Sequence, residues 1–379
     1  MPLRDHYDTI IVGGGIAGAS LAYFLAERGA RDVLLLERET QWARHSTGRS
    51  AATLCQLDPT ETVLELKLIG GRFLRNPPPG FSESPLLRCC GTLTVFDAAG
   101  LQQEETRRPM LQRFGLDASF LDAEEVRQRV PALTDPEIAG GVWVESDGRL
   151  DVHEILSSCL RGARRLGVEI EQGCAVTGLV RTGERIEGVR TAQGEIGSRQ
   201  VVAAAGAWNL ELAAWAEASP IALRPLRRCA AIYSPIEPAA LAVDAPLVVA
   251  DHRSVYFVPE AGEILMSPMD QVEMPPGEPL ADDVVIAEGL ERLALVAPDL
   301  RARRVRRSWA GLRTFSPDLV HVVGEDPARP GFFWLAGQGG YGIETCAAIG
   351  ALAADLLTSG RSEVFDPARL SPARFLRNG

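Results

Sequence analysis

Blocks of apolar and polar residues near the N-terminus predict a strand, a helix and a second strand within the first 37 residues. Apolar runs at 8–12 and 33–36 predict the strands, and the stretch between them has helical periodicity. Gly13, Gly15 and Gly18 form a GxGxxG pattern directly after the first strand. This order is typical of a dinucleotide-binding βαβ unit.

Each residue of this pattern has a mechanical reason. Gly13 allows a tight turn, Gly15 lets the backbone approach a pyrophosphate, and Gly18 with Ala22 lets the helix pack closely on the sheet. The helix N-terminus then offers N–H groups and the positive dipole end to the phosphates. Glu37, at the end of the second strand, is placed to accept hydrogen bonds from a ribose. Glycine turns alone are common, so the prediction depends on all parts being in register.

The rest of the chain continues with alternating elements. A second βαβ-like section begins near 140, with Asp151 as the expected N-cap of its helix. Between about 220 and 315 the pattern changes to alternating strands, interrupted by one amphipathic helix at 284–297. The chain closes with a strand, a glycine loop and an Ala-rich helix over 331–357.

These elements predict an α/β protein with two interleaved domains. We expect a Rossmann-like FAD-binding domain and an α+β substrate domain built on an antiparallel sheet. The expected FAD-binding domain comprises 1–80, 141–219 and 316–379, and the substrate domain 81–140 and 220–315. Glycine-flanked helix starts at both ends of the chain suggest one large cofactor contacted twice, which favours FAD over NAD.

Composition narrows the class of protein. The 379 residues are 46% apolar and carry a formal charge of −11, which disfavours nucleic acid as a partner. The apolar runs are too short for a transmembrane segment, and we see no apolar region typical of a signal peptide. We therefore expect a cytoplasmic location, with peripheral attachment to the inner membrane left open.

Cysteines and histidines give no sign of a metal site. The seven cysteines are scattered without CxxC spacing, which fits a reducing compartment. Cys89 and Cys90 form either a strained vicinal disulfide or two buried thiols, and we favour the thiols. His45 is interpreted as structural, and no metal-ligand spacing is found at the other histidines, which are His6, His153, His252 and His321.

Five segments carry a resemblance to a known family. They are HSTGRSAA at 45–52, NPPPGF at 76–81, AAGAW at 204–208, SWAGLR at 308–313 and QGGYGI at 338–343. In this order they resemble the D-amino acid oxidase superfamily of flavoproteins, and within it the bacterial D-arginine dehydrogenases. The resemblance covers essentially the whole chain and implies its fold and non-covalent FAD binding.

The 45–52 segment also has a physical interpretation of its own. Gly48 permits close backbone approach, and Arg49 is placed to pair with a diphosphate. The alternative is a capped helix start with a solvated arginine. In the relatives this loop lies beneath the flavin, and its continuation, here 54–58, acts as a mobile lid. The expected FAD contacts are Gly13, Gly15, Ile16, Ala17, Gly18, Glu37, Arg38, Ser46, Thr47, Gly48, Arg49, Ser50, Ala51, Ala52, Val176, Ala205, Gly206, Gly339, Gly340, Tyr341, Gly342, Ile343 and Glu344.

Amine oxidation by a flavin needs a clamp that fixes the substrate carboxylate. Arg228 and Arg313 are expected on strands facing the flavin, where a guanidinium fork grips a carboxylate in two places. Arg227 should point the opposite way. The resemblance implies a phenol hydrogen bond from Tyr256 and a carbonyl from Gly340 to the substrate amine. For any single arginine the alternative is a structural ion pair, because the chain has 38 of them.

Three positions depart from the D-arginine dehydrogenase pattern. A substrate-contacting histidine falls on Thr53, the glutamate that receives the guanidinium falls on Thr92, and a pocket tyrosine falls near Asp58. Without that glutamate a buried cationic group lacks its strongest partner. We therefore expect a neutral or apolar substrate side chain, although Asp58 leaves a cation site open.

The single lysine bears on the electron acceptor. Related sarcosine oxidases place a lysine over the flavin to promote reaction with oxygen, and that position falls here at Met266. The cysteine that carries flavin covalently in those oxidases falls near Gly311, and Lys67 lies elsewhere. These departures favour a dehydrogenase with non-covalent FAD. Glycine and D-amino acid oxidases manage without such a lysine.

The sequence therefore predicts an FAD-dependent D-amino acid dehydrogenase. It would transfer a hydride from Cα to flavin N5, release a 2-keto acid and ammonia, and pass electrons to a quinone or another acceptor. One alternative is an oxidase of glycine, sarcosine or a cyclic imino acid that produces peroxide. Another is the flavin-binding subunit of a hetero-oligomeric dehydrogenase, which the arginine clamp argues against.

Overall fold

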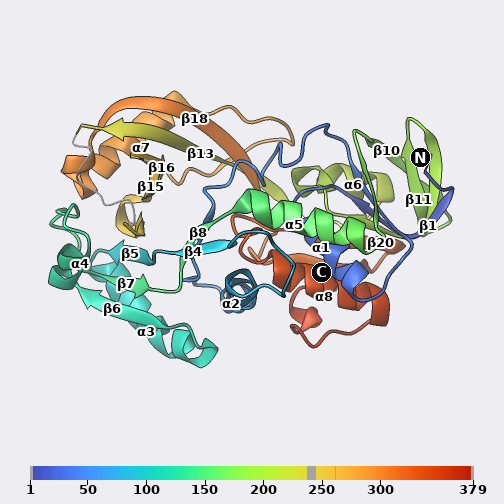
Figure 1. The fold of residues 1–379 in the computed structure, drawn as a ribbon, viewed down its shortest axis with the longest axis horizontal. Coiled ribbons are helices and arrows are strands. Elements are labelled where there is room, and N and C mark those ends of the chain that lie inside the picture. The colour runs from blue at the N-terminus through green and yellow to red at the C-terminus, as the bar shows by residue number, and fades with distance from the viewer. Residues whose placement is uncertain (1–2, 237–244, 261, 377–379) are drawn as a thin grey trace.

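The computed structural model describes residues 3–236, 245–260 and 262–376. Its described strands form three sheets, of eight, nine and three strands. The eight-stranded and nine-stranded sheets lie toward opposite ends of an elongated molecule, with α5, α1, α8 and α2 between them (Figure 1). The α/β fold class predicted from the sequence is confirmed.

The eight-stranded sheet carries the predicted βαβ unit. Its main path runs β10-β11-β12-β1-β2-β9, and β20 pairs with both β12 and β19. β1, β2, β9, β12 and β20 are joined in parallel pairs. The strands are β1 His6–Val12, β2 Val33–Glu37, β9 Glu169–Gln172, β10 Val176–Thr182, β11 Arg185–Thr191, β12 Gly194–Ala203, β19 Val322–Asp326 and β20 Arg329–Ala336.

Helix α1 (Ile16–Glu27) is apolar around most of its circumference because other elements cover it on several sides. It crosses from β1 to β2 and contacts α5 (Val152–Arg165) and α8 (Cys346–Ser359). A Cβ at Gly350 would lie 2.9 Å from Ser20 Oγ, so this glycine lets α8 approach α1 closely. The two helices whose N-termini were predicted to face one cofactor, α1 and α8, thus pack against each other.

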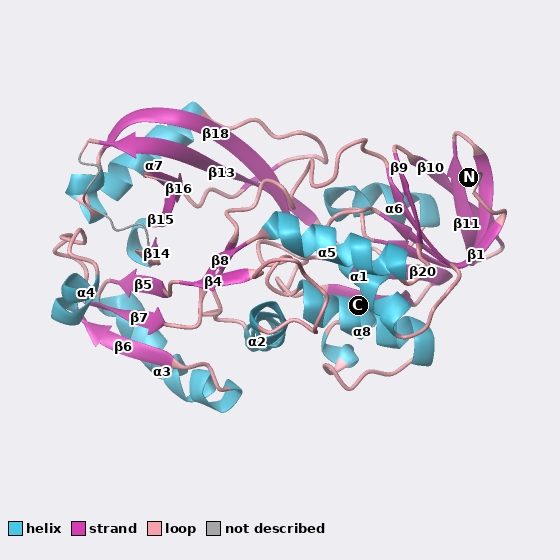
Figure 2. Ribbon diagram, in the orientation of Figure 1, coloured by secondary structure: helices cyan, strands magenta, loops and turns pink. Residues whose placement is uncertain are grey.

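The nine-stranded sheet has the order β17-β13-β16-β15-β14-β5-β7-β6, with β18 beside β13. The long strands β13 and β18 run from this sheet toward the centre of the molecule (Figure 1). Helices α3, α4 and α7 belong to the same region (Figure 2). The strands are β5 Thr92–Phe96, β6 Ala118–Asp122, β7 Gly140–Val144, β13 Arg224–Pro235, β14 Leu247–Ala250, β15 Val255–Glu260, β16 Glu263–Ser267, β17 Val272–Glu273 and β18 Ala302–Phe315.

The small third sheet lies between the two large ones, in the order β3-β8-β4 (Figure 1). It consists of β3 Thr53–Leu54, β8 Gly148–Leu150 and β4 Leu87–Cys89. The remaining α-helices are α2 Glu61–Arg75, α3 Ala98–Phe114, α4 Ala123–Arg129, α6 Asn209–Ala216 and α7 Asp283–Val296. Short 3₁₀ helices occur at Gly206–Trp208, Asp251–Arg253, Pro298–Leu300, Pro367–Arg369 and Pro372–Phe375. None of the helices in the described ranges is long and apolar enough to cross a membrane.

The structure corrects the prediction for β7. This strand was expected to open the second βαβ unit, but it pairs antiparallel with β5 and β6 in the nine-stranded sheet. A fully buried apolar run does not specify which sheet it joins. Close packing at Gly140, where a Cβ would lie 2.5 Å from Leu121 O, fits it to β6. The predicted boundary at 141 therefore falls inside β7, and the domain division otherwise stays a prediction.

The cysteine prediction needs a partial correction. All seven cysteines are free thiols, so Cys89 and Cys90 form no disulfide. Neither is buried, however: Cys89 is exposed and Cys90 is partly exposed. The reason is the position of β4 at the edge of the three-stranded sheet.

The predicted N-cap of α5 is confirmed, because the Asp151 side chain accepts a hydrogen bond of 2.8 Å from Glu154 N. Asp151→Ala removes this partner and should lower the free energy of unfolding by about 0.5–2 kcal/mol. Chemical denaturation of the FAD-loaded protein measures the change. Asp117→Ala, at an exposed position, is the matched control. Equal stability of the two variants would contradict the capping role.

Candidate functional site

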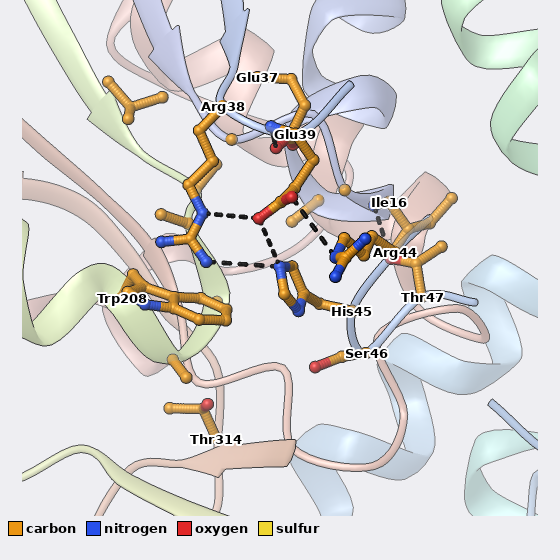
Figure 3. A pocket seen from close by; sticks show the side chains of 18 of the residues that line it. Ile16, Glu37, Arg38, Glu39, Arg44, His45, Ser46, Thr47, Trp208 and Thr314 are labelled. Atoms are coloured by element: carbon orange, nitrogen blue, oxygen red, sulfur yellow. Dashed lines mark hydrogen bonds and ion pairs between the residues drawn. The ribbon is translucent and has the colours of Figure 1, made fainter. Parts of the chain in front are cut away.

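A large cavity opens at the carboxyl ends of β1, β2 and β12 (Figure 3). Its empty volume is ≈ 1160 Å³, including the part open to solvent. The cavity extends from Glu37, Arg38 and Trp208 past the first turn of α1 to Thr314, Gln338 and Gly339.

The glycine turn packs as its sequence predicts. Gly13 has φ +114°, a conformation that favours glycine, and its N–H donates to Leu36 O at 2.8 Å. A Cβ at Gly18 would lie 1.9 Å from Gly13 O, which excludes a larger residue. The turn and the close approach of α1 to β1 therefore require glycine at these two positions.

Glu37 braces the turn from the neighbouring strand. Its carboxylate accepts hydrogen bonds from Gly14 N and from Glu39 N, each at 2.8 Å. Each carboxylate oxygen retains a further acceptor site for a ligand hydroxyl. At the helix start, Thr47 Oγ1 accepts from Ile16 N at 3.1 Å. One of the N–H groups expected to face phosphate is thus already satisfied by the 45–52 loop.

Charged and aromatic side chains shape the end of the cavity near Glu37. The Arg38 guanidinium lies 3.9 Å from the centre of the Trp208 ring, a cation–π contact. Glu39 links Arg38, Arg44 and His45, with 2.9 Å between its carboxylate and His45 Nε2 (Figure 3). The hydrogen bond from His45 lowers the pKa of Glu39. This network presents Trp208 as a flat apolar wall to the cavity.

The opposite end has an unsatisfied polar group. Gln338 lines the cavity, and its amide Nε2 is buried without a hydrogen-bond partner. A buried donor is normally satisfied, so this group points to a ligand acceptor. Ser46 and Thr314 also line this part (Figure 3), and Ser46 Oγ donates to Leu312 O at 2.6 Å. An elongated cavity with a glycine turn, a ribose-type acid and an open donor at the far end fits FAD.

The structure separates the predicted FAD contacts into two groups. Those that line the cavity are Gly13, Gly15, Ile16, Ala17, Glu37, Arg38, Ser46, Thr47, Val176, Ala205, Gly206 and Gly339. Those that do not are Gly18, Gly48, Arg49, Ser50, Ala51, Ala52, Gly340, Tyr341, Gly342, Ile343 and Glu344. Their roles as FAD contacts stay predictions.

Arg49 and Gly48 show why part of the 45–52 loop is absent from the cavity wall. Arg49 donates to Ala310 O and Arg44 O, both at 3.1 Å, and so joins the loop to β18. A Cβ at Gly48 would lie 2.0 Å from Ala43 O, which makes this glycine a packing requirement within the loop.

Sequence reasoning missed several cavity residues. Gln338 is the first residue of the QGGYGI motif, and Trp208 is the last residue of the AAGAW motif. Both could therefore have been identified from the sequence. Arg44 lies in a turn without a recognisable pattern. The residues missed are Val12, Leu36, Glu39, Gln41, Ala43, Arg44, His45, Cys174, Ala204, Ala207, Trp208, Glu211, Leu212, Trp215, Leu312, Thr314 and Gln338.

Beyond the cavity, Arg228 and Arg313 lie on one face of the nine-stranded sheet. β13 and β18 pair antiparallel with Arg228 opposite Gly311 and Leu226 opposite Arg313. Directly opposed residues share a face, and so do residues two apart on one strand. Both guanidiniums therefore project from the same side. Arg227 points the other way, as predicted, and pairs with Asp270 and Asp282, each at 3.2 Å.

These two guanidiniums have no carboxylate partner. Arg228 Nε donates to a backbone carbonyl, Asp270 O, at 2.8 Å, and no ion pair is found for Arg228 or Arg313 within the described ranges. Burial and the neighbouring Arg313 lower the pKa of Arg228 to about 10, and burial lowers the pKa of Arg313. Two desolvated like charges are costly unless an anion compensates them. The arrangement can bind a carboxylate.

Tyr256 and Gly340 border the same space. Tyr256 is opposite Ser267 on β16, on the face of the sheet that carries Arg228, and its phenol influences the pKa of both arginines. A Cβ at Gly340 would lie 1.3 Å from Arg313 Nη2. Only glycine leaves room for the guanidinium there, so the 338–342 turn lies directly against the clamp.

The three departures from the expected pattern are also placed. Thr53 is partly buried in β3, and Thr92 is buried in β5, on the face of the sheet that carries Tyr256. Asp58 does not form an open cation site, because its carboxylate is 3.1 Å from the buried Lys67 Nζ. Its charge is already compensated. Partly buried apolar side chains lie near Tyr256 instead, including Ile232, Val249 and Trp309.

Met266 and Gly311, the two positions from which the electron acceptor was predicted, are both in closely packed surroundings. Met266 is fully buried in the core of the nine-stranded sheet, and a Cβ at Gly311 would lie 3.2 Å from Arg49 Cβ. No group of three or more metal-ligating side chains is found in the part of the chain that the structure describes.

Comparison with known proteins gives a consistent result. The sequence model of the DAO family, described as FAD dependent oxidoreductase, matches residues 8–356. Among curated relatives, dimethylglycine dehydrogenase of Rattus norvegicus mitochondria is 26% identical over 98% of this chain and 45% of its own length. Glycine oxidase of Bacillus subtilis is 24% identical over 94% of both chains. The chain spans about half the length of the relatives it matches first.

A solved structure shows the same fold along the whole chain. L-proline dehydrogenase from P. horikoshii superposes with a TM-score of 0.89 at 24% identity, covering 99% of each chain. None of the relatives named here is a D-arginine dehydrogenase, so the narrower resemblance to those enzymes stays an expectation.

The Glu37 contacts generate a prediction for cofactor affinity. Glu37→Gln replaces one acceptor oxygen by an NH₂ group facing a backbone N–H, which should cost about 1–3 kcal/mol and weaken FAD binding roughly 5- to 150-fold. Titration of the apoprotein with FAD measures the dissociation constant. Glu211→Gln, which also lines the cavity but is exposed, is the control. An unchanged constant for Glu37→Gln would disprove this role.

Proposed function

The chain belongs to the DAO family of FAD-dependent oxidoreductases, and on this basis we propose that it oxidises the carbon–nitrogen bond of a small α-amino acid: an N-methylated glycine, glycine or a cyclic imino acid. FAD is the cofactor of this family. The proposal concerns the substrate class and the residues that bind it.

One observation carries the proposal: Arg228 and Arg313 share a face of the sheet, and neither forms an ion pair with a carboxylate of the described residues. A substrate carboxylate would supply the missing charge and accept paired N–H donors. Tyr256, on the same face, can add a phenol hydrogen bond. An amino acid is the simplest substrate that brings a carboxylate and an oxidisable amine together.

The surroundings of the clamp support a substrate whose side chain is small and uncharged. Thr92 stands where a cation-binding glutamate was considered, and Asp58 is engaged by Lys67. Ile232, Val249 and Trp309 add apolar surface nearby. The relatives named above act on dimethylglycine, glycine and L-proline, all without a charged side chain. None of these names specifies a D-amino acid. They favour the alternative substrates, which are glycine, sarcosine or a cyclic imino acid.

The residues of this chain would orient the reaction. The arginine pair fixes the carboxylate, and the Gly340 carbonyl accepts a hydrogen bond from the amine, so that the Cα–H is directed toward the cofactor. Bound FAD supplies a hydride acceptor for that hydrogen. The amine loses its ammonium proton to solvent before this transfer, and the freed nitrogen lone pair forms a C=N bond as the hydride leaves carbon; water hydrolyses the imine after release. Cofactor retention is proposed to be non-covalent, since Gly311 offers no thiol.

Anaerobic bleaching of the flavin band tests this function. The purified holoprotein is mixed with sarcosine, dimethylglycine, glycine, L-proline, and D- and L-alanine in turn. Reduction by one of the first four at rates well above those with alanine supports the proposal. Faster reduction by D-alanine would restore the D-amino acid prediction. No reduction by any of them would contradict the proposal and favour a flavin-binding subunit.

Reoxidation of the reduced protein identifies the acceptor. Rapid recovery of the flavin band on admission of air indicates an oxidase that produces peroxide. Slow recovery in air together with fast recovery on addition of a soluble quinone indicates a dehydrogenase.

Arg313→Ala should lower kcat/KM for the active substrate by about 10²–10³-fold, because one half of a desolvated carboxylate clamp is lost. FAD content should be unchanged. Stopped-flow reduction of the flavin, measured per bound FAD, gives the comparison. Arg304→Ala, exposed on the same strand and without an ion pair in the described structure, should behave as wild type. Survival of full activity in Arg313→Ala would show that the clamp is wrongly assigned.

A further inference from the structure

The single lysine of the chain has no part in the chemistry above, yet it is buried. Lys67 lies on α2, and its Nζ donates to Cys55 O at 2.9 Å. The same ammonium is 3.1 Å from the Asp58 carboxylate and 3.6 Å from that of Glu344. A buried charge is stable only when its interactions with partners offset the cost of its desolvation. The buried ammonium of Lys67 therefore requires these partners.

Lys67 joins two segments that are distant in the sequence. Cys55 and Asp58 belong to the segment 53–58, and Glu344 belongs to the loop 338–345. The segments also touch directly, because Glu344 Oε2 accepts from Cys55 N at 2.7 Å. A Cβ at Gly70, one turn beyond Lys67 on α2, would lie 1.9 Å from Glu344 O. Helix α2 is therefore in close contact with this loop.

Both segments lead to the substrate site. The loop 338–345 contains Gly340, whose missing Cβ leaves room for the Arg313 guanidinium. The Tyr341 ring in the same loop is 5.6 Å from Lys67 Nζ. The segment 53–58 contains Cys55, which packs in the same apolar cluster as Tyr256. A shift of either segment would displace groups that border the substrate amine.

The cluster holds more potential negative than positive charge. Asp147 accepts from Gln56 N at 3.2 and 3.0 Å, and burial raises its pKa to about 8. Burial also raises the pKa of Glu344, and Lys67 opposes that effect. The pKa of Lys67 is raised because Glu344 and Asp58 outweigh the burial of its charge. The other ionisable groups around the cluster include Cys55, Tyr341, Arg313, His321 and, facing Asp58 from α3, Glu104.

We propose that Lys67 is a positioning residue for the amine oxidation: its ammonium draws the carboxylates of Asp58 and Glu344 together and so holds segment 53–58 and the Gly340 turn against the substrate amine. This inference rests on the proposed function. The arginines of the carboxylate clamp are held by β13 and β18, so loss of Lys67 should affect orientation of the amine more than binding of the carboxylate.

Removal of the ammonium should make the reaction pH-dependent. In Lys67→Met the pKa of Glu344 rises further, because the ammonium that opposes the effect of burial is gone. At low pH Glu344 is neutral and the two segments stay together. As the pH rises through that pKa, an uncompensated carboxylate forms beside Asp58, and repulsion separates the segments.

The experiment compares wild type, Lys67→Met, Lys67→Met/Glu344→Gln and Arg72→Met, all as holoproteins. Arg72 is exposed on the same helix and is the charge-removal control. Stopped-flow reduction by the best substrate of the panel gives the limiting rate from pH 6 to 9, per bound FAD. Titration with acetate, followed by the flavin spectrum, gives the dissociation constant of a plain carboxylate.

The proposal expects Lys67→Met to lose about 10- to 100-fold in limiting rate at pH 9, and much less at pH 6. The acetate constant should change less than about threefold, as expected for a clamp left intact. Lys67→Met/Glu344→Gln should recover most of the rate and lose the pH dependence, because the surplus carboxylate is gone. Arg72→Met should match wild type.

A rate in Lys67→Met equal to wild type at every pH would overturn the inference, as would a loss that does not vary with pH. If the single variant does not fold, the double variant decides: a pH-independent rate near wild type supports charge balance, and a deep loss contradicts it. An inactive wild type refutes the proposed function and this inference together. An active wild type with an unaffected Lys67→Met refutes the inference alone.

Discussion

The proposed binding of substrate depends on two guanidiniums that lie on the same face of one sheet and form no ion pair within the described residues. Arg228 and Arg313 project from one face of β13 and β18, and each is partly withdrawn from water. Among the described residues no carboxylate lies within ion-pair distance of either guanidinium, whereas the adjacent Arg227 pairs with Asp270 and Asp282. An anionic ligand is therefore the natural completion of the site, and the glycine at 340 keeps the space open beside it.

A second group of charges surrounds Lys67 beside the 338–345 loop. Asp58, Glu344 and Asp147 lie behind the 338–345 loop, and Lys67 is the cation between them. In the proposed function, one group of charges binds the carboxylate end of the substrate, and the other fixes the loops that border its amine. The two ends of an amino acid are thereby handled by separate elements, strands for the carboxylate and loops for the amine.

The sequence predicted the parts of the fold whose signals are local. The glycine turn after β1, the acid at the end of β2 and the Asp151 cap depend on neighbouring residues, and all are found as expected. β7 was assigned to the wrong sheet, because a buried apolar run is compatible with either. The engagement of Asp58 by Lys67 brings together residues from different elements. No periodicity encodes such a contact, so the sequence alone left a cation site at Asp58 open as an alternative.

The most direct test of the central claim is a crystal structure of the FAD-loaded protein with pyrrole-2-carboxylate, a planar analogue of a cyclic imino acid. The account predicts that both carboxylate oxygens lie within hydrogen-bond distance of Arg228 and Arg313, with the ring nitrogen directed to the Gly340 carbonyl. A carboxylate bound elsewhere, with the two guanidiniums left facing water, would contradict it.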